Sequence, residues 1–79
     1  MPKYDHYKEA EHLASLLVQD GAKEYSALLL NAMNEGCTGS EICMALRWHV
    51  NNILKLDFIS DESRAYAQKL WIELDKVLQ

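Results

Sequence analysis

Apolar side chains recur at steps of three and four residues along nearly the whole chain, and this spacing constrains the fold more than any other feature. Such a period places the apolar residues on one face of an α-helix. No segment shows the two-residue alternation that is typical of a half-buried strand. The chain has 79 residues, enough for one domain with one hydrophobic core. We therefore predict an all-α fold, a compact four-helix domain.

Residues between the periodic segments predict where the helices begin and end. Gly21 suits a left-handed residue after the first helix, and Ser60 is a favoured N-cap for the last. Before the third helix, Thr38 and Glu41 fit a capping box, with Ser40 as the alternative cap. The predicted helices span about residues 4–19, 22–35, 39–56 and 61–78.

The apolar faces of these four helices predict the hydrophobic core. Leu16 and Ile72 fall outside the apolar faces of their own helices and are candidates for exposed residues. The residues expected to point inward are Tyr7, Ala10, Leu13, Ala14, Leu17, Val18, Tyr25, Leu28, Leu29, Ala32, Met33, Ile42, Ala45, Leu46, His49, Val50, Ile53, Tyr66, Ala67, Leu70, Leu74, Val77 and Leu78.

Acidic side chains are concentrated in the first half of the chain. The net charge is −4. Residues 1–41 contain three basic and seven acidic residues, whereas residues 42–79 contain five of each. Nucleic acids and anionic membranes both require positive charge on a protein, so neither is an expected partner. A basic protein is the partner that this charge distribution favours.

The cysteines and the N-terminal segment indicate the cellular compartment. Cys37 and Cys43 are the only cysteines, and they form neither a C-x-x-C motif nor a Cys/His cluster suited to zinc. Residues 4–11 are charged where a signal peptide requires an apolar segment. No stretch approaches the roughly 18 apolar residues of a membrane span. We expect a cytoplasmic protein with both thiols reduced.

Two groups of residues invite a catalytic or metal-binding interpretation. Glu9-x-x-His12 has the local spacing of a carboxylate-bridged di-metal site, but the required acids on other helices fall mainly on polar faces. His49 has no nucleophile or acid at a suitable spacing, and Cys43 is nearly two turns away. We interpret the first group as a solvated face and His49 as a core or boundary residue. No phosphate-binding loop, nucleophile elbow or metalloprotease helix is present, so we expect no enzyme activity, cofactor or metal.

The predicted third helix carries two large apolar residues outside its inward face. Met44 and Trp48 are separated by four residues and, at about 100° per residue, lie mostly opposite Leu46 and Ile53. One interpretation is an exposed patch, because Trp is a favoured anchor of protein interfaces. The other is that a steep crossing of the second or fourth helix covers them. The sequence leaves both open.

Residues 35–49 resemble the helix-turn-helix of DNA-binding regulators, with a helix end, a glycine turn and a polar start to the next helix. A recognition helix here would offer few groups for phosphates or bases, and the preceding helices are acidic. Those groups are Arg47, Trp48, Asn51, Asn52 and Lys55. A small DNA-binding regulator or antitoxin is therefore an alternative hypothesis.

The layout of nearly the whole chain resembles the small, acidic, all-helical immunity proteins of bacterial polymorphic toxin systems, including contact-dependent growth inhibition. The shared pattern is an early helix pair, a G-x-T-G-x-E-I-x-x-x-L-R junction and a final amphipathic helix. The junction residues are Gly36, Thr38, Gly39, Glu41, Ile42, Leu46 and Arg47. This resemblance implies a stoichiometric inhibitor of a cognate secreted toxin domain, often a nuclease.

On this hypothesis, acidic groups speed association with a basic toxin, and apolar anchors slow dissociation. The candidate contact residues are Glu9, Glu35, Glu41, Met44 and Trp48. Occlusion of the toxin's active site and binding beside it both stay open. A helical adaptor or oligomerisation module, with self-association of the chain, is the third hypothesis.

Overall fold

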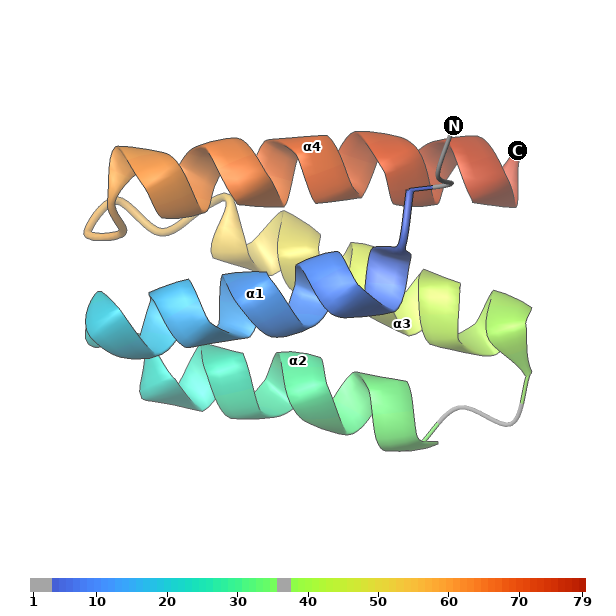
Figure 1. The fold of residues 1–79 in the computed structure, drawn as a ribbon, viewed down its shortest axis with the longest axis horizontal. Helices are drawn as coiled ribbons and strands as arrows, with labels where there is room; N and C mark the ends of the chain where they lie inside the picture. Colours follow the sequence, from blue (N-terminus) through green and yellow to red (C-terminus); the bar gives the residue numbers. More distant parts are fainter. Residues whose placement is uncertain (1–3, 36–37) are drawn as a thin grey trace.

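The computed structural model describes residues 4–35 and 38–79, apart from the side chain of Glu35. Over these residues the chain forms four α-helices and no strand, which confirms the predicted all-α, four-helix fold. The helices are α1 (His6–Gln19), α2 (Lys23–Glu35), α3 (Gly39–Ile53) and α4 (Asp61–Leu78). Successive helices run in opposite directions (Figure 1).

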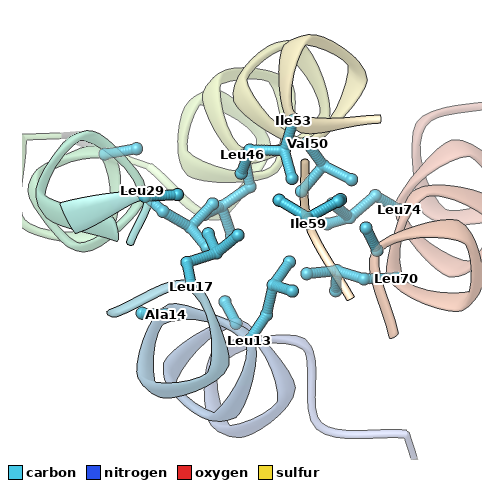
Figure 2. Packing of buried hydrophobic residues seen from close by; sticks show 14 of the residues in the cluster. Leu13, Ala14, Leu17, Leu29, Leu46, Val50, Ile53, Ile59, Leu70 and Leu74 are labelled. Carbon is cyan, nitrogen blue, oxygen red and sulfur yellow. The ribbon is translucent and has the colours of Figure 1, made fainter. Parts of the chain in front are cut away.

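The four helices surround one core, with α1 and α3 at diagonal positions (Figure 2). Each helix packs against its neighbour in the chain, and α4 closes the arrangement by packing against α1 as well as α3. Short connections favour this antiparallel order, because a helix that follows a short turn returns alongside its predecessor. As a consequence, α4 has one groove against α1 and another against α3.

The first helix begins two residues later than predicted, because Asp5 is its N-cap. The Asp5 carboxylate accepts a hydrogen bond from the backbone N–H of Lys8 at 3.1 Å. At the other end, Gly21 has a φ of +83°, as predicted for a left-handed cap. The N–H of Ala22 donates to the Leu17 carbonyl at 2.8 Å, and that of Gly21 to the Val18 carbonyl at 3.2 Å. This pair of bonds is a Schellman motif.

The third helix ends at Ile53, three residues earlier than predicted. Arg64 of α4 explains this earlier end, because its guanidinium donates to the carbonyls of Leu54 at 3.1 Å and Leu56 at 2.8 Å. The chain therefore leaves the helix with these carbonyls satisfied by a side chain. At the start of α3, Thr38 rather than Ser40 is the N-cap, and its Oγ1 accepts from the Glu41 N–H at 3.2 Å.

Leucine, isoleucine and valine side chains of α1, α3 and α4 make up most of the core. Leu29 of α2 packs against them (Figure 2). Ile59, from the segment between α3 and α4, is buried with them, although the helical pattern did not include it. The largest fully buried side chains are Leu13, Leu17, Leu29, Leu46, Ile53, Leu70, Leu74, Val50 and Ser63. Cys43 is a small core residue.

Four residues predicted to point inward are instead exposed, and their placement in the core was wrong. Tyr7, Val18, Leu28 and Val77 are 42–55% exposed. They lie at the edges of their apolar faces, and in a ring of four helices each helix buries only a narrow arc against the centre. The outer flanks of these faces stay open to solvent.

Leu16 shows the opposite difference, because it is only 8% exposed although it lies outside the predicted apolar face. His12, one turn earlier on α1, stacks on the ring of Tyr66 of α4 with centroids 4.5 Å apart. Leu16 lies on this same flank of α1, so tertiary packing rather than the helix's own pattern buries it. Ile72 is 48% exposed, as its position predicts.

Candidate protein-binding surface

The outer face of α3 carries Glu41, Met44 and Trp48 at spacings of three and four residues. Such spacings place all three on one side of a helix. Met44 is 57% exposed and Trp48 is 63% exposed, whereas Leu46 and Val50 on the opposite side are fully buried. Of the two interpretations that the sequence allowed, the exposed patch is therefore the one found. Exposure of large apolar side chains to water is unfavourable, and a partner surface that covered Met44 and Trp48 would remove this cost.

A groove of about 430 Å³ lies beside this face, between α3 and α4. Met44, Arg47, Trp48 and Asn51 line it from α3, and Trp71 lines it from α4. The pattern of α4 did not identify Trp71, which lies at the edge of its buried face and is half-buried. Only the packing of α4 against α3 brings the two tryptophans of the chain to one groove.

An ion pair links the two helices along this groove. Nη1 of Arg47 contacts Oδ1 of Asp75 at 2.5 Å, and Gln79 Nε2 donates to the other oxygen of that carboxylate at 3.0 Å. An ion pair that is partly exposed to solvent contributes only about 0–1 kcal/mol to stability. The pair also offsets the positive charge of Arg47, which lines the groove together with Met44, Asn51 and the two tryptophans.

The five predicted contact residues do not form one continuous face. Glu41, Met44 and Trp48 lie together on α3, whereas Glu9 is half-buried in a second hollow on the α1 side of α4. Glu35 is the last residue of α2, and its side chain lies outside the described part of the structure. The helix α4 therefore separates Glu9 from the other described candidates.

Each of the three histidines contacts an aromatic ring or a backbone carbonyl in the described part of the chain. His12 stacks on Tyr66, and His6 Nε2 lies 3.4 Å from the Glu73 carbonyl oxygen. His49 is half-buried, and its ring meets that of Trp48 edge-to-face with centroids 5.0 Å apart. Among residues 4–35 and 38–79, His, Cys, Asp and Glu side chains form no group of three or more that could hold a metal ion.

Cys43 lies inside the domain, and burial raises the pKa of its thiol. A thiol with a raised pKa is less often in the reactive thiolate form at neutral pH. The other cysteine, Cys37, lies outside the described residues. No described helix combines the length and the apolar character that crossing a membrane requires.

Comparison of the chain with protein-family models, with curated proteins and with solved structures finds no match. The exposed face of α3 and the grooves that flank α4 are the surface features of the described residues that could hold a partner.

Proposed function

We propose that this protein is a binding protein that neutralises a basic protein partner, as an immunity protein neutralises its cognate secreted toxin. The observation that carries the proposal is the exposure of Trp48 and Met44 beside the groove that contains Trp71. Tryptophan in a shallow apolar groove is a favoured anchor of protein interfaces, because it buries a large rigid surface at low entropic cost. Interfaces of this kind need no catalytic group on the inhibitor.

The net charge of −4 supports a basic partner. Acidic groups attract such a partner over distances of about a Debye length, roughly 8 Å in physiological salt. They therefore raise the rate of association, while the apolar groove determines the rate of dissociation. A nuclease toxin fits this description, because it carries basic groups that hold its own substrate.

Capture of the partner from the source cells tests the proposal. Tagged protein is incubated with lysate, washed at high salt and analysed by mass spectrometry, in parallel with Trp48→Ala and Phe58→Ala variants. Phe58 is a matched control, because it is 55% exposed and lies beside the α1–α2 turn, away from the Trp48 groove. We expect one stoichiometric basic protein that the Phe58→Ala variant retains and the Trp48→Ala variant loses.

The captured protein is then assayed for its own activity with increasing amounts of the purified chain. Complete inhibition near a one-to-one molar ratio supports a neutralising function. Full activity at molar excess of the chain contradicts it. Equal capture by both variants shows that the face around Trp48 is the wrong surface.

A gel shift with duplex DNA at moderate salt tests the alternative of a DNA-binding regulator. Arg47, the basic residue of α3, is paired with Asp75. A recognition helix normally uses such a residue for phosphates or bases, so we expect no shift. Recovery of the tagged chain alone, with a dimer in sedimentation velocity, identifies the third alternative of a self-associating module.

A further inference from the structure

The second hollow beside α4 lies on its α1 flank and has a volume of about 260 Å³. It is lined by Tyr4 and Glu9 from one side and by Ala65, Tyr66 and Lys69 of α4 from the other. Lys69 and Trp71 are two residues apart in α4, so this hollow and the Trp48 groove flank the same stretch of the helix. A partner that covers the outer face of α4 reaches both.

The aromatic walls of this hollow suit a positive charge. Nζ of Lys69 already lies 5.9 Å from the centroid of the Tyr4 ring, within the range of a cation–π contact. Lys69 is held there by an ion pair with Glu73 at 3.1 Å. The face of Tyr4 therefore already accepts a cation from within the protein.

Glu9 supplies a negative charge that the described residues leave unpaired. Its carboxylate makes no hydrogen bond or ion pair with any residue of the described ranges, whereas Glu73 contacts both Lys69 and Lys76. Burial, then the charges of Glu9 and Glu73, raise the pKa of Tyr4 to about 12. The carboxylates of Glu9 and Glu73 therefore both act on the Tyr4 hydroxyl, on the same side of α4 as Lys69.

We infer that this hollow binds an arginine side chain of the protein partner, with the Glu9 carboxylate accepting hydrogen bonds from the guanidinium and Tyr4 and Tyr66 forming its walls. A guanidinium is planar, weakly hydrated and able to donate two parallel hydrogen bonds to one carboxylate, which an ammonium group does not do. The identity of the partner rests on the proposed function, but the chemistry of the hollow can be tested without it.

The test is a titration of ¹⁵N-labelled protein with N-acetyl-arginine amide, followed by backbone amide shifts. N-acetyl-leucine amide at matched salt is the reference for effects unrelated to the guanidinium. We expect saturable shifts at residues 9, 66 and 69 with the arginine probe alone. Glu9→Gln weakens the binding about three- to fivefold, the range of a solvent-exposed ion pair. Glu11→Gln, which removes the same charge from the α2 side of α1, leaves it unchanged.

The two lysines of α4 give a second matched comparison. Lys69→Gln removes the internal cation from the Tyr4 ring and tightens probe binding, whereas Lys76→Gln makes the same change in net charge outside the hollow. Equal effects within either pair of variants would mean general charge attraction and would overturn the inference, as would shifts no larger than those with the leucine probe. These outcomes are independent of the capture experiment with Trp48→Ala, so either proposal can fail alone.

Discussion

Asp20, immediately after α1, accepts a hydrogen bond at 2.5 Å from the hydroxyl of Ser63 in the first turn of α4. The same carboxylate oxygen also accepts from the backbone N–H and the hydroxyl of Ser60, at 3.0 and 3.1 Å. Ser60 is itself the N-cap of α4. One carboxylate therefore ties the end of the first helix to the start of the last and sits beside the N-terminal dipole of α4.

These hydrogen bonds stabilise the charged carboxylate, so they predict how stability depends on pH. The bond from Ser63, then that from the Ser60 backbone, lower the pKa of Asp20 below its ordinary value of 3.8. Because the folded-state pKa is below the unfolded one, ionised Asp20 stabilises the fold at pH above 3.8. This stabilisation is lost as the pH falls below 3.8 through the folded-state pKa.

Ser63→Ala removes the largest cause of the shift in the pKa of Asp20. We expect a loss of about 1 kcal/mol in the free energy of unfolding near neutral pH, the usual contribution of one hydrogen bond. The difference from the unmodified protein should narrow as the pH falls below 3.8, as measured by urea denaturation over a series of pH values. The pKa of Glu73 is also lowered, first by its hydrogen bond with Lys69. This shift is present both in the unmodified protein and in the Ser63→Ala variant, so it does not contribute to the difference between them. A difference that stays constant over this pH range contradicts the prediction.

Substitution by alanine is predicted to change stability in opposite directions at Gly21 and Gly39. Gly21 has a φ of +83°, so Gly21→Ala forces a side chain into the left-handed region and destabilises the protein by about 1–2 kcal/mol. Gly39 begins α3, and a Cβ added there meets no atom within 4 Å. Gly39→Ala should stabilise the protein by about 0.4–1 kcal/mol, mainly by restricting the unfolded chain. Thermal denaturation of both variants measures the two signs; the same sign for both is the contradicting result.

The burial of Leu46 and Trp48 predicts that truncating the larger side chain, Trp48, lowers the free energy of unfolding less. Leu46 is fully buried, and Leu46→Ala should lower the free energy of unfolding by about 2–5 kcal/mol because it leaves a cavity. Trp48 is 63% exposed, and Trp48→Ala should change the free energy of unfolding by no more than about 0.5 kcal/mol. Urea denaturation checks both values. A large destabilisation by Trp48→Ala would mean that this tryptophan serves folding rather than binding.

Cys43 should react slowly with thiol reagents while the protein is folded. It is 7% exposed, and its pKa is raised by burial, so both access and thiolate fraction are low. In a Cys37→Ser variant, the reaction with Ellman's reagent at pH 8 should be about tenfold or more slower than that of free cysteine. It should reach the free rate in concentrated urea. A folded protein that reacts at the free rate contradicts the burial of Cys43.

The sequence by itself determined the number, order and approximate bounds of the helices. Apolar spacing and local end signals are properties of residues close together in the chain, so Gly21, Thr38 and Ser60 identified helix ends without tertiary information. Position on the helix likewise placed Met44 and Trp48 away from the inward face of α3. The predicted end of α3 was wrong because the true end depends on Arg64, which lies in α4 and not in α3.

Only the tertiary structure decided which flanks of the helices are covered. A helical pattern predicts which face of a helix is apolar, but the neighbouring helices decide how wide a part of the helix is buried. Val18 lies on the predicted apolar face and is exposed, whereas Leu16 lies outside it and is buried. Trp48 and Trp71 line one groove, and Glu9 and Tyr66 line one hollow, although the members of each pair are far apart in the chain. Both arrangements follow from how α4 packs between α1 and α3, and helix packing is a relation between surfaces rather than a property of any one segment.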